Sequence, residues 1–305
     1  MKDYLNAISL LPEPFHTALA GVPPQFGALV NEVRLRAGGA VTLHTAGDVR
    51  YLSATGEPTL VYNDAVLTCS ARDLQNVVFC LARRSLHTYQ EMLARGFLPL
   101  SGGCKAGVAG CAVLRGGEVY AVTSFQSVNI RVCREYPGCS REVTEAAGTA
   151  GSFLIVGPPL SGKTTVLRDL CRRYSGADSL HPLKTAVIDE RDEIASRAFG
   201  EGRNVGEHTD VLSLYPKAVG MEIALRTLSP DVIVLDEIGA EAEARAMLSA
   251  MNSGVRFVAT AHGGSVEEVL RRPNIRTLVD AGVFEAAVLL AGRGEPCRVR
   301  EAVRL

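Results

Sequence analysis

The sequence has 305 residues, of which 47% are hydrophobic and 21% charged, and its formal net charge at pH 7 is −1. This composition is typical of a globular chain with one or two domains, and it excludes an overall basic field that would attract nucleic acid or anionic membranes. No apolar run approaches the roughly 18 residues of a membrane span and no signal peptide is recognisable, so we expect a cytoplasmic protein.

The first half of the chain predicts a small α+β domain. Short segments of alternating apolar and polar residues, separated by glycine-rich turns, indicate strands. A helix is predicted in SARDLQNVVFCLARRSL, where apolar residues recur at helical spacing after the serine cap Ser70. The strand segments are EVRLRAG (32–38), GVAGCAVL (107–114), EVYAVTS (118–124) and VNIRVCR (128–134).

The pattern changes between residues 134 and 152, where turn residues and charges interrupt the apolar segments. We expect a boundary there, giving an N-terminal domain of residues 1–145 and a second domain of residues 146–305. In the second domain, apolar runs alternate with helical stretches, which predicts a mostly parallel sheet covered on both faces. Its strand segments are SFLIVG (152–157), KTAVIDE (184–190), DVIVLDEIG (231–239), VRFVATAH (255–262) and FEAAVLLA (284–291).

The stretch GPPLSGKTT follows a buried strand and precedes a helix, the context in which G-x-x-x-x-G-K-[ST] forms a phosphate-binding loop. Its backbone N–H groups would face a triphosphate at the helix N-terminus. Lys163 would reach the β- and γ-phosphates, and the Thr164 hydroxyl would bind Mg²⁺. A glycine-rich turn that only caps a helix is the alternative. The predicted nucleotide-binding residues are Gly157, Pro158, Pro159, Leu160, Ser161, Gly162, Lys163, Thr164 and Thr165.

A pair of acids ends the strand segment DVIVLDEIG. Ligands of open α/β sheets bind at the carboxyl ends of the strands, which is where Asp236 and Glu237 lie. Asp236 would hold Mg²⁺ through water, and Glu237 would orient or deprotonate the attacking water. Two adjacent acids can also be a solvated helix start, but their combination with the phosphate loop favours catalysis.

A second acidic cluster, VIDERDEIA, also follows an apolar strand. It would place Asp189, Glu190 and Glu193 at the same edge if the strands are neighbours. Two interpretations stay open, a catalytic role and a surface cluster in which Arg191 pairs with a neighbouring acid. His262 ends a further strand, before a predicted Ser-x-x-Glu capping box, and is either a cap residue or a phosphate sensor.

The eight cysteines are scattered, with no C-x-x-C pair and no histidine at metal-ligand spacing. We therefore expect reduced, structural thiols.

Three arginines of the first domain could act on a nucleotide. The two-residue period of a strand puts Arg34 and Arg36 together on the face opposite to their apolar neighbours, and Arg131 on the outward face of its own strand. They are either solvated arginines of a half-buried sheet or part of a face that closes over nucleotide, in the same subunit or the next. The second interpretation would make hydrolysis depend on the N-terminal domain.

The motifs together resemble the stage III sporulation protein AA family, a branch of the secretion ATPases related to type II and type IV secretion motors. The resemblance covers nearly the whole chain in the family's order. The stretches that carry it are EVRLRAGG, GFLPLSGGCKAGVAGCAV, SVNIRVCRE, GPPLSGKTTVLRDL, VIDERDEIA, TDVLSLYPKAVGMEIALRTLSPDVIVLDEIG and ATAHGGSVEEVLRRPNIRTLVDAGVF.

The resemblance implies a RecA-like P-loop ATPase domain behind a smaller N-terminal domain, with ATP and Mg²⁺ as cofactors. It also implies a hexameric ring in the mother cell that energises a channel to the forespore with membrane-channel proteins as partners. Carried over by position, the acidic box spans residues 189–193, His262 is the histidine box, and Arg226 lies before the second nucleotide motif. This chain departs from the family pattern at Leu160, often a glycine, and from other secretion motors at Asp236, commonly a non-acidic residue.

Three functions stay open after this comparison. The first is an ATPase motor of a membrane-associated assembly. The second is a nucleic-acid-associated RecA-like ATPase, which the absence of tryptophan and the near-zero net charge disfavour. The third is a nucleotide-gated ring scaffold in which hydrolysis is incidental.

Overall fold

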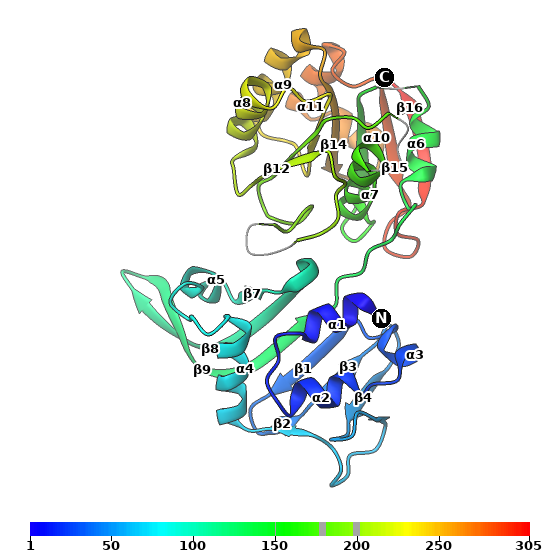
Figure 1. Cartoon of the computed structure of the whole chain (residues 1–305). Coiled ribbons are helices and arrows are strands. Elements are labelled where there is room, and N and C mark those ends of the chain that lie inside the picture. Colours follow the sequence, from blue (N-terminus) through cyan, green and yellow to red (C-terminus); the bar gives the residue numbers. More distant parts are fainter. Residues whose placement is uncertain (150, 177–180, 198–201) are drawn as a thin grey trace. The chain divides into compact units, whose positions relative to one another are not determined.

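The computed structural model of the chain describes residues 1–149, 151–176, 181–197 and 202–305. They form two compact units, one of residues 1–134 and one that begins at Glu135 and extends to Leu305 (Figure 1). Each unit has its own sheet and its own hydrophobic core.

The first unit is built on an antiparallel sheet in which consecutive strands are mostly neighbours. A short ladder pairs β2 (Gly39–Ala40) with β6 (Thr68–Cys69). The strands of the main sheet, in spatial order, are β5 (Pro58–Thr59), β4 (Val49–Leu52), β3 (Thr42–His44), β1 (Glu32–Arg36), β9 (Glu118–Arg131), β8 (Lys105–Arg115) and β7 (Phe97–Pro99).

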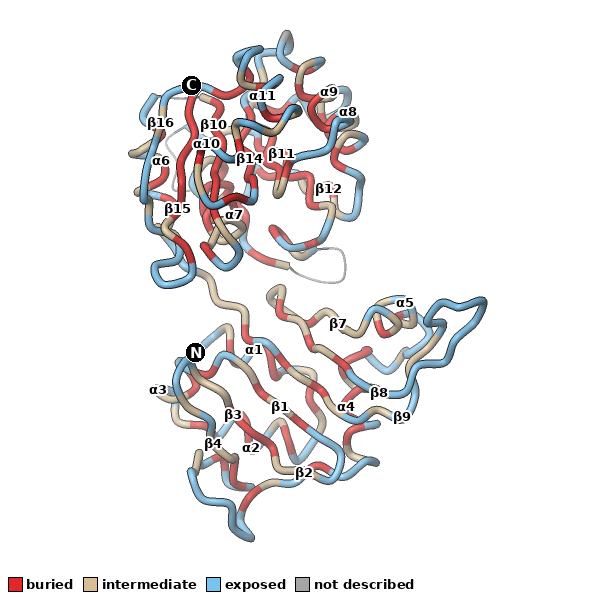
Figure 2. The backbone as a smooth tube through the Cα atoms, turned by 180° about the vertical axis from the view of Figure 1, so that it is seen from behind, coloured by how far each residue is buried: buried red, intermediate tan, exposed pale blue. Residues whose placement is uncertain are grey.

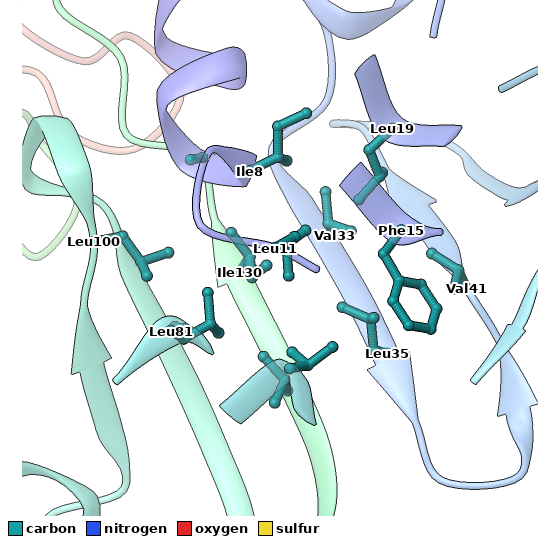
Figure 3. Packing of buried hydrophobic residues seen from close by; sticks show 14 of the residues in the cluster. Ile8, Leu11, Phe15, Leu19, Val33, Leu35, Val41, Leu81, Leu100 and Ile130 are labelled. Atoms are coloured by element: carbon teal, nitrogen blue, oxygen red, sulfur yellow. The ribbon is translucent and has the colours of Figure 1, made fainter. Parts of the chain in front are cut away.

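Helices cover one face of this sheet and contribute side chains to its core. Figure 3 shows Ile8, Phe15 and Leu19 from the first helices packing on Val33 and Leu35 of the sheet, and all five are almost fully buried. The helical segments are α1 (Lys2–Ile8), α2 (Phe15–Ala20), α3 (Pro24–Gly27), α4 (Ala71–Leu81), α5 (Gln90–Ala94) and the 3₁₀ turn η1 (Ser101–Gly103).

Two expectations for this unit have clear outcomes. The predicted serine cap is confirmed, because the Ser70 hydroxyl accepts the Asp73 N–H, 3.1 Å away, at the start of α4. The expectation of two short strands at 118–124 and 128–134 is wrong, because a single strand, β9, runs from Glu118 to Arg131. The ladder between β9 and β8 shifts register between Ala109 and Cys111, and β9 continues through this irregularity.

The second unit is built on a sheet whose strands are parallel except for β16 at one edge. The central strands are buried along their whole length, as Figure 2 shows. The strands in spatial order are β12 (Thr209–Ser213), β11 (Thr185–Asp189), β13 (Val232–Leu235), β14 (Arg256–His262), β10 (Phe153–Gly157), β15 (Ala286–Leu290) and β16 (Val299–Arg304).

Side chains alternate between two cores on the opposite faces of this sheet. Along β10, Leu154 and Val156 belong to the core on one face of the sheet, and Phe153 and Ile155 belong to the core on the other face. The first core is covered by α8 (Lys217–Thr227), α9 (Glu241–Ala250), α10 (Val266–Leu270) and α11 (Pro273–Asp280), with the 3₁₀ turn η2 (Met251–Ser253) after α9. The second core is covered by α6 (Arg141–Ala147) and α7 (Lys163–Ser175).

Candidate functional site

The predicted phosphate loop lies between β10 and α7, at the carboxyl end of an inner strand of the sheet. Because α7 begins at Lys163, the N–H groups of its first turn have no partner within the helix and are available to an anion. Gly157 must be a glycine, since an added Cβ would lie 2.4 Å from the Ser161 hydroxyl. That hydroxyl is buried and has no hydrogen-bond partner among the described residues.

Lys163 folds back over the loop that it belongs to. Its Nζ donates to the carbonyl oxygens of Gly157 and Pro158, at 2.8 and 3.0 Å. Burial lowers the pKa of Lys163, and the carboxylates of Asp236 and Glu237 oppose that shift only in part. A bound polyphosphate would give this cation a stronger partner than two carbonyl groups.

Leu160 occupies a backbone conformation that favours glycine. Its φ is 63°, in the left-handed region, and its side chain is exposed. A glycine would adopt this conformation without strain, whereas the exposed leucine avoids only a clash with surrounding side chains.

The two predicted nucleotide motifs meet through a hydrogen bond. The Thr164 hydroxyl donates to Asp236 Oδ2 at 2.7 Å, although the two residues are 72 positions apart in the chain. Asp236 follows β13, whose neighbour β14 contributes Thr260, and the Thr260 hydroxyl donates to Asp236 Oδ1. Hydroxyl and carboxylate oxygens are ligands that Mg²⁺ accepts, so this pair fits the ion that the sequence predicts.

Glu237 lies in an uncommon backbone conformation, with φ 55°. Thr260 holds it there, because its hydroxyl accepts the Glu237 N–H at 2.7 Å and its carbonyl oxygen accepts the Ile238 N–H at 2.8 Å. Strained residues of this kind cluster at functional sites. The Glu237 carboxylate, 41% exposed, pairs with the guanidinium of Arg191 from the second acidic cluster.

The second acidic cluster forms a turn after β11 that is organised around Asp189. The buried Asp189 carboxylate accepts backbone N–H groups of residues 193–196, at 2.8 to 3.4 Å. The guanidinium group of Arg168, in α7, binds the same turn by donating hydrogen bonds to the carbonyl oxygens of Glu193 and Ile194. Asp189 therefore shapes the turn, while the Glu193 side chain is exposed.

Glu190, which is itself partly exposed, belongs to a charge cluster with the buried Lys217 and Glu243. Its Oε2 lies 3.0 Å from Nζ of Lys217, the first residue of α8, and Oε1 of Glu243 lies 2.9 Å from the same nitrogen. The other Glu243 oxygen accepts the N–H groups of Gly239 and Ala240, just after the Asp236–Glu237 pair. Burial would lower the pKa of Lys217, but its hydrogen bonds to both glutamates outweigh burial and raise it.

His262 lies next to the phosphate loop. It is the last residue of β14, it is paired in register with Gly157 of β10, and its side chain is exposed. The predicted helix cap behind it is present, since the Ser265 hydroxyl accepts the Glu268 N–H at 3.2 Å. The Glu268 carboxylate accepts the Gly264 N–H rather than that of Ser265.

Each predicted arginine is described within its own unit. Arg226 of α8 is 76% exposed and pairs with Glu222 on its own helix. In the first unit, Arg34 and Arg131 both pair with Glu32, and Arg36 is exposed at the end of β1. The alternation predicted for these strands is confirmed by the burial of their apolar residues.

Sequence reasoning missed two residues of the site, Thr260 and Lys217. Thr260 is hidden in the apolar stretch FVATAH, although a lone hydroxyl near the end of a buried strand, beside two acids, was a usable signal. Lys217 reads as a surface lysine after Pro216, and nothing in the local pattern shows that Glu190 and Glu243 converge on it.

Comparison with known proteins places the chain in a family. The family model described as sporulation stage III, protein AA matches residues 11–303. Stage III sporulation protein AA of Bacillus subtilis is 33% identical over 302 residues, which cover 97% of this chain and 94% of that protein. Competence protein ComGA of Streptococcus pneumoniae is 26% identical over 144 residues, 47% of this chain and 41% of that protein.

Solved structures share the fold. The ATPase DotB of Legionella pneumophila superimposes with a TM-score of 0.53 at 17% identity, covering 85% of this chain and 72% of that chain. The pilus retraction motor PilT with bound ADP gives a TM-score of 0.56 at 16% identity, over 85% and 74%. The predicted fold class, a RecA-like domain with a mostly parallel sheet behind a smaller α+β domain, is confirmed. Within the described parts of the chain, no helix is both long and apolar enough to cross a membrane.

Proposed function

Because this chain belongs to the sporulation stage III protein AA family, we propose that it is an ATP-hydrolysing motor of a secretion-like channel complex in sporulation. Its fold is that of the secretion ATPases. The substrate would be ATP with Mg²⁺, bound by the loop of residues 157–165.

The observation that carries this proposal is the contact between Thr164 and Asp236, at 2.7 Å. It joins the first turn of α7 to the end of β13, so an oxygen-ligand pair lies beside the N–H groups that would hold the phosphates. Thr164 would bind Mg²⁺ directly and Asp236 would bind it through water. Lys163 would leave the carbonyl oxygens of Gly157 and Pro158 and neutralise the terminal phosphates.

Glu237 is the proposed general base. Release from Arg191 would leave its carboxylate able to orient and deprotonate the attacking water. Glu193 is the alternative base from the second acidic cluster. Glu190 is less suited to accept a proton, because its carboxylate is engaged by Lys217.

His262 and Arg226 have proposed roles around the nucleotide. His262 lies beside the phosphate loop and would sense the terminal phosphate. Arg226 is exposed and would act on the nucleotide of a neighbouring copy in a ring.

The assembly that we propose is a hexameric ring in the cytoplasm of the mother cell. It would bind membrane-channel proteins of the sporulation complex and no nucleic acid. Membership of a sporulation family supports this setting, and the fold shared with a pilus retraction motor supports the motor role.

The ion pair between Arg191 and Glu237 favours a second candidate, the nucleotide-gated scaffold. A base that stays paired would allow ATP to bind and assemble the ring with little hydrolysis. The two candidates predict the same binding site but different turnover.

Steady-state hydrolysis by the full-length protein separates them. We expect Mg²⁺-dependent turnover by the wild type, and a loss of about 100-fold or more in Glu237→Gln with ATP affinity nearly unchanged. Glu241→Gln, an exposed acid in the first turn of α9, is the matched control and should resemble the wild type.

Each contrary result has a defined meaning. Wild-type turnover in Glu237→Gln would move the base to the second acidic cluster. A wild type that binds ATP and assembles without hydrolysing it would establish the scaffold and reject the motor.

A further inference from the structure

Two cysteines from distant parts of the second unit meet at the first turn of α7. Cys139 lies just before α6, and Cys297 lies in the connection between β15 and β16. The Cys139 thiol donates to the Thr165 carbonyl oxygen at 3.7 Å, and the Cys297 thiol donates to the Gly162 carbonyl oxygen at 3.8 Å. These two carbonyl groups lie three residues apart at the start of α7, and each thiol is the main influence on the pKa of the other, so the two side chains lie close together.

Cys297 is in direct contact with the phosphate loop. Its N–H donates to the Ser161 carbonyl oxygen at 2.8 Å. Gly162 has φ 91°, and an added Cβ there would lie 2.5 Å from the Cys297 sulfur, so the thiol fills the space that a side chain at 162 would need. A Cβ added at Gly292, in the same connection, would contact Pro158 at 3.4 Å. The β15–β16 connection therefore packs along the outside of the loop.

Cys139 is anchored to a different part of α7. Its two neighbours, Gly138 and Ser140, donate their N–H groups to the Asp169 carboxylate at 3.0 and 2.8 Å. The Ser140 hydroxyl donates to the same carboxylate at 2.6 Å. One thiol is thus fixed to the body of the helix and the other to the loop that precedes it. Both are only partly buried, so a small oxidant can reach them.

We propose that Cys139 and Cys297 form an oxidisable dithiol whose disulfide weakens nucleotide binding at the phosphate loop. The existence of the disulfide is independent of the proposed function, but its effect rests on the proposed ATP site. The co-reactant is a hydroperoxide, with hydrogen peroxide as the simplest case.

The oxidation balances in two steps. The Cys297 sulfur attacks one peroxide oxygen, an S–O bond forms, the O–O bond breaks, and the leaving hydroxide becomes water with the proton from Cys297. The Cys139 sulfur then attacks the sulfenic sulfur, an S–S bond forms, the S–O bond breaks, and hydroxide leaves as water with the Cys139 proton. Two electrons pass from the sulfurs to the peroxide, giving one disulfide and two waters.

Cys297 is suited to attack first. The hydrogen bond from Cys139 lowers the pKa of the Cys297 thiol, although burial opposes the shift. The same pairing raises the pKa of Cys139, with burial adding to the increase.

The disulfide would act by moving Cys297. An S–S bond is about 2.05 Å long, much shorter than a thiol hydrogen bond, so oxidation draws Cys297 toward Cys139. Because Cys297 touches Ser161 and Gly162, that movement distorts the loop. We expect the oxidised protein to bind ATP at least about fivefold more weakly, and bound nucleotide must then oppose disulfide formation by the same factor.

The test uses the full-length protein, hydrogen peroxide, and a non-hydrolysable ATP analogue with Mg²⁺. Peptide mass mapping identifies which cysteines are linked, and calorimetric titration gives the affinity of the reduced and oxidised forms. Cys139→Ser should keep the affinity of the reduced protein and lose its response to peroxide. Cys111→Ser, which removes an exposed thiol of β8, is the matched control and should respond like the wild type.

A Cys139–Cys297 link that forms reversibly and lowers the affinity, in the wild type and Cys111→Ser only, supports the inference. The inference is overturned if peroxide links other pairs, such as Cys104 with Cys133, or if the linked protein binds the analogue as tightly as the reduced protein. If the reduced wild type does not bind the analogue at all, the proposed ATP site is rejected instead. Mass mapping still shows in that case whether the Cys139–Cys297 disulfide forms.

Discussion

The Thr260 hydroxyl serves both acids at the end of β13. It donates to Asp236 and accepts the N–H of Glu237, while it is itself fully buried. One hydroxyl therefore fixes the direction of the proposed Mg²⁺ ligand and the backbone conformation of the proposed base. Its removal would leave a partly buried carboxylate oxygen and the N–H of Glu237 without their partner.

Thr260→Val tests this residue. The change preserves shape but removes the hydroxyl, and we expect turnover to fall about tenfold or more with a smaller effect on ATP affinity. Thr260→Ser, which retains the hydroxyl, should restore most of the turnover. Steady-state kinetics and calorimetric titration of both variants measure the difference. Equal turnover in Thr260→Val and the wild type would show that the hydroxyl does not position the acids.

At the scale of elements, α7 organises what surrounds the phosphate loop. The Asp169 carboxylate accepts hydrogen bonds from the turn at residues 138–140. Arg168 donates hydrogen bonds to backbone carbonyl oxygens of the turn after β11. Lys217 ties that second turn, through Glu190, to the segment that follows Glu237. Polar contacts, and not apolar packing alone, therefore join the loop to both acidic segments and to the connection before α6.

The Asp169 carboxylate makes the attachment of residues 138–140 dependent on pH. Burial would raise its pKa, but hydrogen bonds from Ser140, Gly138 and Arg172 outweigh burial and lower it below the ordinary 3.8. The Asp169 carboxylate binds a proton more weakly in the folded protein than in the unfolded chain. Its contribution to the free energy of unfolding is therefore complete above the ordinary pKa of 3.8, and it is lost as the pH falls through the lowered pKa of the folded state.

We expect Asp169→Asn to lower the free energy of unfolding by about 2 kcal/mol at pH 7. The difference between variant and wild type should shrink as pH falls below 3.8. Urea unfolding at several pH values measures both effects, and Asp210→Asn, an exposed acid of β12, is the control. A difference that stays constant down to pH 2.5 would contradict this assignment.

At the scale of the whole molecule, the arginines of the first unit are its candidates for a part in hydrolysis. Two of its three candidate arginines share one acid, since Glu32 pairs with Arg34 and Arg131 and accepts a hydrogen bond from Asn129 at 2.8 Å. Burial would raise the pKa of Glu32, but these partners lower it, so it remains their counter-ion at neutral pH.

If the sheet face that carries these arginines acts on the nucleotide, Arg34→Ala, Arg36→Ala and Arg131→Ala should each lower kcat while ATP affinity stays largely intact. Phosphoryl transfer that uses such an arginine can lose about 10³-fold when it is removed. Arg95→Ala, an exposed arginine after α5, is the control. Full turnover in all three variants, and in the isolated second unit, would leave the first unit as a docking module.

The sequence could predict most of the fold but only part of the site. Strand segments such as SFLIVG and the loop at residues 157–165 are local patterns, and local patterns were sufficient for the parallel sheet and for the order of its motifs. The link from Thr164 to Asp236 followed from the rule that ligands bind at strand carboxyl ends. The roles of Thr260 and Lys217 could not be predicted from the sequence. They depend on which strand lies beside β13 and on which charged side chains converge after folding.

The most direct test of the ATP site is a calorimetric titration of the wild type and Lys163→Ala with Mg²⁺ and a non-hydrolysable ATP analogue. The lysine is the phosphate loop's own cation, so its loss should weaken binding by about 30-fold or more, roughly 2 kcal/mol. Lys184→Ala, a lysine at the opposite end of the sheet before β11, should bind like the wild type. Equal affinity in Lys163→Ala and the wild type would contradict the assignment of residues 157–165 as the nucleotide site.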